Sequence, residues 1–231
     1  MASIYEDGTY LERNPAWHEQ DAPWKAAQIR KMLSRNGLLP QRVCDIGCGT
    51  GEVLRLLAES GPDTASYIGY DISPQALDVA KTKENSRLFF RVGSMPSVAD
   101  EPFDLITCMD VFEHVEDYFS FLRGVRAQAE FKVFHVPLDL SVQTVLRKGA
   151  LLQRRTDLGH IHYFTKEVAL AILHDTGHDV IDYFYAHKFC DSKQVGFLNN
   201  VMKVALNTLF GIQEDIAARI VGCSSLMILA K

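Results

Sequence analysis

One stretch of the sequence limits the possible folds most. It is a short apolar run that contains an acid and leads into a loop of alternating glycines. The run covers residues 43–46 and includes Asp45, and apolar residues at helical spacing follow from Val53, so the predicted order is strand, loop, helix. The glycines of the loop are Gly47, Gly49 and Gly51. Because glycine has no Cβ, such a loop can turn sharply and let a ligand approach the backbone. Open α/β sheets bind ligands at this end of a parallel strand.

Two common nucleotide-binding loops differ from this one. A P-loop carries Lys and then Ser or Thr after its last glycine, whereas Glu52 stands here and would repel a phosphate chain. A dinucleotide-binding loop has the spacing GxGxxG, whereas these glycines are spaced GxGxG. A turn with incidental glycines is the remaining alternative.

The pattern DxGxGxG, which begins at Asp45, resembles motif I of the class I S-adenosylmethionine-dependent methyltransferases. An acid suits S-adenosyl-L-methionine, because this cofactor carries an ammonium group and a sulfonium. The resemblance implies that the cofactor is bound by five residues of the motif: Asp45, Gly47, Cys48, Gly49 and Gly51.

A second acid, Asp71, lies near the end of a second predicted strand at residues 67–72, and Ser73 and Pro74 are suited to start the next helix. A carboxylate there can accept hydrogen bonds from both hydroxyls of a ribose. NAD-dependent enzymes share this feature. A nucleotide-dependent oxidoreductase therefore stays an alternative, as does a non-catalytic S-adenosylmethionine-binding module.

The loops after the third and fourth predicted strands, residues 88–92 and 103–109, complete the expected cofactor site. In the resembled family the first of these loops meets the adenine, often through an aspartate. Ser94 stands there instead, with Met95 and Ile72 as candidate apolar walls; a plain turn is the alternative. The resemblance places Asp110 and Val111, after the fourth strand, beside the methionine part of the cofactor.

Asp110 also begins a DxxEH pattern that continues with Glu113 and His114. It is similar to the ExxEH set proposed to hold a divalent metal in ubiquinone-type O-methyltransferases. Because acids in this position also cap and charge the start of a helix, we expect no metal.

Histidines supply the candidate catalytic bases. A fifth strand, residues 131–136, contains His135, and a long basic segment at residues 138–163, interpreted as irregular, precedes Phe164. Long segments beyond strand ends often carry function. His160 fits a His-x-x-x-Phe-Thr stretch that borders the acceptor pocket in several small-molecule methyltransferases. A hydroxyl acceptor needs a base, for which the candidates are His162, His160 and His135; each could instead be structural.

Two further segments are expected around the acceptor. Residues 1–35, rich in aromatic side chains, would form a structural flap or a lid with Lys25 or Arg30 near the carboxylate of the cofactor. Residues 195–210 predict an amphipathic helix that packs in the core, covers the substrate or forms a homodimer face. Three arginines suit an anionic acceptor or face water: Arg147, Arg154 and Arg155.

Composition narrows the function further. The 231 residues are 47% hydrophobic, which suits one large α/β domain, and the net charge of -5 argues against a nucleic-acid partner. The five scattered cysteines lack zinc-site spacing and favour a reducing cytoplasm. The sequence opens with no signal peptide and contains no membrane-spanning run of about 20 apolar residues.

With a sixth strand at residues 179–186 and a seventh at 225–230, the resemblance implies an α/β fold. This fold is a Rossmann-like three-layer sandwich around a seven-stranded, mostly parallel sheet with an antiparallel last strand. We expect a single methyltransferase domain over residues 1–231, with substrate-side insertions at 138–164 and 188–222. The predicted function is O- or N-methylation of a small-molecule acceptor by in-line transfer, in which positioning supplies much of the acceleration.

Overall fold

A computed structural model describes residues 14, 17, 19–94, 102–187, 211, 213–222 and 224–231. The expectations for Met95, for residues 195–210 and for residues 1–13 lie outside the described residues.

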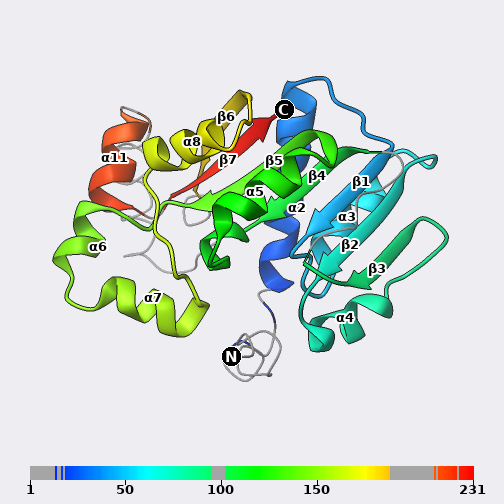
Figure 1. The fold of residues 1–231 in the computed structure, drawn as a ribbon, viewed down its shortest axis with the longest axis horizontal. Coiled ribbons are helices and arrows are strands. Elements are labelled where there is room, and N and C mark those ends of the chain that lie inside the picture. Colours follow the sequence, from blue (N-terminus) through cyan, green and yellow to red (C-terminus); the bar gives the residue numbers. More distant parts are fainter. Residues whose placement is uncertain are drawn as a thin grey trace.

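Seven strands form one sheet in the order β3-β2-β1-β4-β5-β7-β6 (Figure 1). The first five pair in parallel, and β7 lies antiparallel between β5 and β6, which confirms the predicted fold class. The strands are β1 (Arg42–Ile46), β2 (Ser66–Asp71), β3 (Leu88–Val92), β4 (Phe103–Met109), β5 (Ala129–Pro137), β6 (Val180–Ala186) and β7 (Ser225–Ala230).

Helices cover both faces of the sheet, because each buries one apolar stripe. One face packs against α2 (Ala22–Arg35), α3 (Glu52–Ser60) and α4 (Pro74–Lys81). The other packs against α5 (Tyr118–Arg126), α8 (Lys166–Asp175) and α11 (Glu214–Val221) (Figure 1). The result is the expected three-layer sandwich. No helix among the described residues is long and apolar enough to cross a membrane.

Short sequence signals set the helix starts. The Ser73 hydroxyl accepts a hydrogen bond from the Ala76 amide at 3.4 Å, with Pro74 in the first turn of α4. Thr165 caps α8 in the same way through the Val168 amide. Both follow the preference of hydroxyl side chains for the residue before a helix.

The segment after β5 differs from the prediction of an irregular loop. It contains two helices, α6 (Val142–Leu146) and α7 (Ala150–Leu158). Ser141 and Thr144 form a reciprocal capping box at the start of α6, and Gly149 and Gly159 flank α7 with φ of 80° and 81°. These end signals, rather than a continuous apolar face, define the two helices, and this is why apolar periodicity missed them.

Candidate active site

The three glycines between β1 and α3 have different reasons to be glycine. All have positive φ, 72°, 54° and 76° for Gly47, Gly49 and Gly51. A Cβ on Gly47 would lie 2.7 Å from Val111 Cγ2, and one on Gly51 would collide with the Phe90 ring. A Cβ on Gly49 would meet nothing within 4 Å. Gly49 is therefore the member of the motif whose backbone faces open space that a ligand can occupy.

Asp71, at the end of β2, holds this loop. Its Oδ2 accepts a hydrogen bond from the Gly49 amide at 2.8 Å, and its Oδ1 accepts one from the Ser73 amide at 2.8 Å. Burial raises the pKa of Asp71, against the lowering effect of these backbone bonds. A carboxylate has about four acceptor positions, so two bonds leave capacity for the hydroxyls of a ribose. Ile72 follows, half-buried.

Asp45 lies beneath the loop rather than at its surface. The side chain is 2% exposed, and its Oδ1 accepts a hydrogen bond from the Thr107 hydroxyl of β4 at 2.6 Å. Burial raises the pKa of Asp45 to about 7, partly offset by this hydrogen bond and by nearby Lys25. Cys48 is also buried, and its Sγ packs where a Cβ on Gly69 would be. Both side chains support the loop, so Cys48 can offer a cofactor only its backbone.

The loop after β3 lies near Asp71. The Gly93 amide donates to the Asp71 carbonyl at 2.9 Å, and Ser94 is exposed beyond it. The position of Ser94 is compatible with the expected place beside the adenine.

Asp110, at the end of β4, joins three elements. Its backbone is left-handed, with φ of 60°. Its Oδ2 lies 2.7 Å from Lys25 Nζ of α2, and its Oδ1 lies 2.5 Å from His135 Nδ1 of β5. Burial opposes ionisation of Asp110, but the charges of His135 and Lys25 outweigh it and hold the pKa well below its usual range. The group is a fixed negative charge at the carboxyl edge of the sheet.

The geometry of His135 argues against its expected role as a base. Nδ1 contacts Asp110, and Nε2 lies 2.6 Å from the Ser225 hydroxyl of β7. The Trp24 ring packs edge-on against the imidazole, with 5.5 Å between centroids. Both nitrogens are occupied, so His135 orients Asp110 instead of receiving a proton from an acceptor.

His160 has the arrangement of an oriented base. Its Nδ1 lies 2.5 Å from Asp139 Oδ2, and Arg154 pairs with the other oxygen of Asp139 at 3.0 Å. If Nδ1 donates to the carboxylate, the lone pair is on Nε2. His162 differs, since its Nε2 contacts the Val115 carbonyl at 3.0 Å and its ring packs edge-on against Tyr118.

A third cluster combines Glu113 and His114, on the short helix η2 (Phe112–His114), with His160. One potential ligand atom from each lies within 4.8 Å of the others. Glu113 is 0% exposed, and neither carboxylate oxygen has a hydrogen-bond partner in the described part of the chain. Burial raises the pKa of Glu113 well above its usual value, and burial lowers that of His114 to about 4. Asp110 of the DxxEH pattern is engaged elsewhere, so this set could hold a cation only with His160 as its third member.

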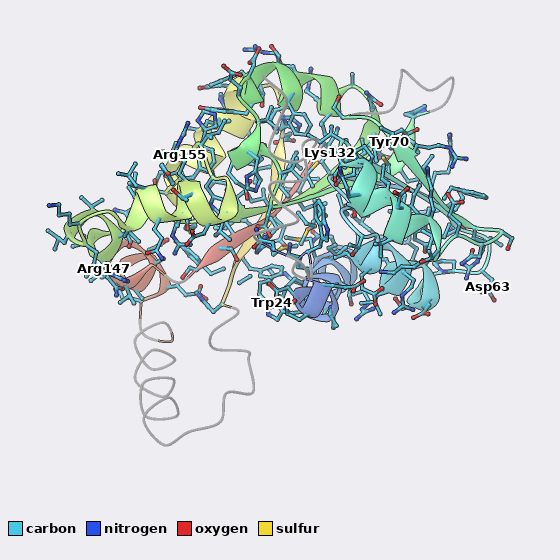
Figure 2. All side chains as sticks on the ribbon, turned by 90° about the horizontal axis from the view of Figure 1, so that it is seen from below. Trp24, Asp63, Tyr70, Lys132, Arg147 and Arg155 are labelled. Atoms are coloured by element: carbon cyan, nitrogen blue, oxygen red, sulfur yellow. The ribbon has the colours of Figure 1, made fainter. Side chains whose placement is uncertain are left out.

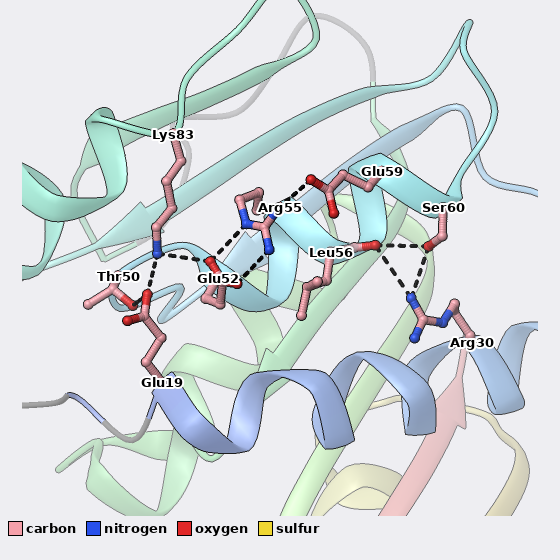
Figure 3. A network of polar contacts seen from close by, with 9 residues as sticks. All are labelled: Glu19, Arg30, Thr50, Glu52, Arg55, Leu56, Glu59, Ser60 and Lys83. Carbon is pink, nitrogen blue, oxygen red and sulfur yellow. Dashed lines mark hydrogen bonds and ion pairs between the residues drawn. The ribbon is translucent and has the colours of Figure 1, made fainter.

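The start of α2 is tied to the glycine loop by a polar network (Figure 3). Glu19, in the turn η1 (Glu19–Asp21), contacts Thr50 at 3.3 Å and also pairs with Lys83. Lys83 in turn pairs with Glu52 at 3.0 Å. Arg30 instead bonds Ser60 of α3 at 3.0 Å. Of the two cations expected near the cofactor, Lys25 lies in the site and Arg30 lies on the flank of α3.

Two site residues escaped the sequence analysis. Thr107 donates a hydrogen bond to Asp45 from the neighbouring strand, and Asp139 contacts the imidazole of His160. Thr107 lies opposite Asp45 in the register of β1 and β4, so knowledge of this strand pairing would have identified it. Asp139 carried no local pattern, although an acid two residues after a strand end is a common place for a site residue.

Together, the sheet order and the acids at its carboxyl edge define a nucleoside-binding α/β protein. A family model described as a methyltransferase domain matches residues 16–183. The chain belongs to that family, which confirms the resemblance to class I S-adenosylmethionine-dependent methyltransferases.

Curated relatives match part of this chain. A ubiquinone biosynthesis O-methyltransferase of Actinobacillus pleuropneumoniae serotype 7 is 35% identical over 102 residues, 40% of this chain and 42% of the relative. A mitochondrial one of Schizosaccharomyces pombe is 39% identical over 95 residues, 38% of this chain and 34% of the relative. The chain spans less than half the length of these relatives.

Solved structures share the fold. The putative methyltransferase in complex with the Trm112 methyltransferase activator of Haloferax volcanii is 16% identical, with a TM-score of 0.66 over 97% of this chain and 94% of that one. Magnesium protoporphyrin IX methyltransferase of Synechocystis, solved with bound SAH, is 19% identical, with a TM-score of 0.58 over 95% and 86%.

Proposed function

We propose that this protein transfers a methyl group from S-adenosyl-L-methionine to a small-molecule acceptor. The observation that carries the proposal is the open space over Gly49, whose amide is fixed by the Asp71 carboxylate. A backbone without a side chain on its ligand side, next to an acid with spare acceptor positions, suits a nucleoside.

The residues present fit this cofactor. Asp71 would accept from the ribose hydroxyls, the Gly49 backbone would face the ligand, and Lys25, held by Asp110, would lie near the carboxylate of the cofactor. When bound, the cofactor supplies an activated methyl group on a good leaving group. The chain then has to hold the acceptor in line and exclude water, and such positioning is worth up to about 7–11 kcal/mol in favourable cases.

A hydroxyl oxygen is the acceptor atom that the site serves best. The Asp139–His160 pair gives a buried imidazole one fixed nitrogen and one nitrogen able to receive a proton. The names of the curated relatives, O-methyltransferases, point to the same atom. His162 remains a second candidate, and an amine acceptor would need neither.

The arginines between β5 and His160 bear on the charge of the acceptor. Arg154 is linked to His160 through Asp139, so an anionic acceptor group would meet Arg154 first. Arg147, which follows α6, and Arg155, on α7, are exposed (Figure 2). We also keep the proposals of a single domain, of cytoplasmic location and of a homodimer, the last of which light scattering can test.

Calorimetric titration with S-adenosylhomocysteine and, separately, with NAD tests the cofactor assignment. We expect binding of the first and none of the second; the reverse would make the protein an oxidoreductase. A methyl-transfer assay over a panel of phenols and amines then distinguishes an enzyme from a binding module, because only an enzyme releases S-adenosylhomocysteine in proportion to a methylated product.

A further inference from the structure

The helices α6 and α7 carry large apolar side chains that the fold leaves in solvent. Neither helix has a buried residue. Leu146 is 79% exposed and Leu152 68%, and Val142 and Val145 are also exposed. Val142, Val145 and Leu146 are spaced i, i+3 and i+4, which places them on one side of α6. Clustered exposed apolar side chains mark interaction surfaces.

Polar contacts help to attach the two helices to the body of the protein. Thr144 donates to the Asp139 carbonyl at 2.7 Å, Tyr163 donates to the Leu151 carbonyl at 2.7 Å, and Arg154 pairs with Asp139. Figure 1 shows α6 and α7 at the periphery of the fold. The exposed valines and leucines are therefore available to a partner without loss of these attachments.

The two helices and the turn between them carry positive charge on an acidic protein. Between residues 141 and 159 the basic residues are Arg147, Lys148, Arg154 and Arg155, and Asp157 is the one acid. Arg147, Lys148 and Arg155 are exposed, and none forms an ion pair with another residue of the described chain. Figure 2 shows Arg147 and Arg155 on this outer part of the molecule.

We propose that α6 and α7 dock reversibly on an anionic lipid bilayer. Leucine and valine side chains would enter the boundary between headgroups and acyl chains while the arginines and Lys148 contact the anionic headgroups, as in interfacial helices. Charge complementarity selects this occupant, because a nucleic acid would leave the apolar side chains in water. We call this surface the α6–α7 face; it consists of Val142, Val145, Leu146, Arg147, Lys148, Leu152 and Arg155.

The place of this face in the chain links it to the acceptor. It lies between Asp139 and His160, the two ends of the proposed catalytic pair. This link rests on the proposed function, whereas lipid binding itself does not, so vesicle binding can be tested without any methyl acceptor.

The experiment is co-sedimentation of the whole protein with vesicles of phosphatidylcholine alone or of phosphatidylcholine with phosphatidylglycerol. We expect binding to the anionic vesicles, weaker binding to the neutral ones, and release as sodium chloride is raised. Leu146→Asp and Arg147→Glu should each weaken binding by about tenfold.

The controls match these variants in exposure and charge. Leu39, also 79% exposed, lies before β1, and exposed Lys81 lies at the end of α4, so Leu39→Asp and Lys81→Glu should bind vesicles as the wild type does. Absence of binding to anionic vesicles, or equal loss in the controls, would overturn the proposal. A much larger fall in Tm for Leu146→Asp than for Leu39→Asp would also overturn it, since the face would then pack against the chain itself or a second copy.

Discussion

Lys25 Nζ lies 2.7 Å from Asp110 Oδ2, and this ion pair ties α2 to the end of β4. Asp110 has a left-handed backbone, which costs a residue with a Cβ about 1–2 kcal/mol. Lys25 and His135 occupy both carboxylate oxygens and hold the residue in this conformation. Helix α2 is thus part of the site and not only a cover for the sheet.

Removal of the cation should destabilise the protein. We expect Lys25→Met to lower the free energy of unfolding by about 1–3 kcal/mol, because a half-buried carboxylate loses one of its two partners. Lys81→Met, at an exposed position of α4, is the control and should change little. Chemical denaturation measures both; equal stabilities would show that the pair contributes nothing.

The open space over Gly49 leads to a paired glycine prediction. Gly37 and Gly49 both have positive φ, and a Cβ would meet nothing within 4 Å at either. Gly37→Ala and Gly49→Ala should each cost about 1–2 kcal/mol of stability. Calorimetry should find weaker S-adenosylhomocysteine binding in Gly49→Ala alone. Equal affinities in the two variants would move the ligand away from this loop.

Asp71 should contribute to cofactor affinity directly. We expect Asp71→Ala to weaken S-adenosylhomocysteine binding by about 1.5–3 kcal/mol, the range for hydrogen bonds to a charged group. Asp78→Ala, an exposed acid on the neighbouring α4, should bind normally. If folded Asp71→Ala keeps full affinity, the ribose does not bind there.

Glu113 predicts a pH dependence of stability. Burial raises its folded pKa, so the stability it contributes is complete below its unfolded pKa of about 4.3 and is lost as pH rises through the folded pKa. Relative to Glu113→Gln, the wild type should lose up to about 1.4 kcal/mol per pH unit in that window. Denaturation curves at a series of pH values provide the measurement.

The same variant tests the expectation of no metal. A neutral Glu113 needs no cation, so EDTA should leave both the Tm and the turnover of the wild type unchanged. A fall in the wild-type Tm on adding EDTA, absent in Glu113→Gln and reversed by magnesium, would establish a metal at Glu113, His114 and His160.

The proposed base should affect turnover without affecting cofactor binding. His160→Ala should lose about 10²-fold or more in kcat at unchanged S-adenosylhomocysteine affinity. Asp139→Asn should also lower kcat. The double variant should lose little more turnover than His160→Ala alone, because Asp139 and His160 act as a unit. Full activity of both His160→Ala and His162→Ala would favour an amine acceptor, and a parallel loss of affinity would make these histidines structural.

Local patterns in the sequence predicted the framework well. All seven strands, the caps at Ser73 and Thr165 and the family were predicted, because they depend on apolar periodicity and on residues close in sequence. The spacing of the three glycines predicted a ligand-binding loop, but only Gly49 faces open space. Gly47 and Gly51 are needed because Val111 and Phe90, which come from other segments, leave no room for a Cβ. Pairings across the sheet, such as Asp45 with Thr107, cannot be read from one segment.

His135 is a residue for which the sequence predicted a role that its contacts argue against. As a sequence position it was a candidate base, but Ser225, 90 residues later, occupies its second nitrogen. Which nitrogens of a histidine are available depends on partners that only the folded chain brings together.

The antiparallel insertion of β7 between β5 and β6 has a consequence for biosynthesis. Asp110 is held by a lysine from α2 and, through His135, by a serine from β7. During translation, the ribosome must release β7 before this contact can form, so a nascent chain that has completed β1 to β5 still lacks the settled geometry of Asp110. The geometry of Asp110 therefore depends on the last strand of the sheet to be synthesised, whereas the contact between Asp71 and Gly49 needs only β2 and the loop after β1.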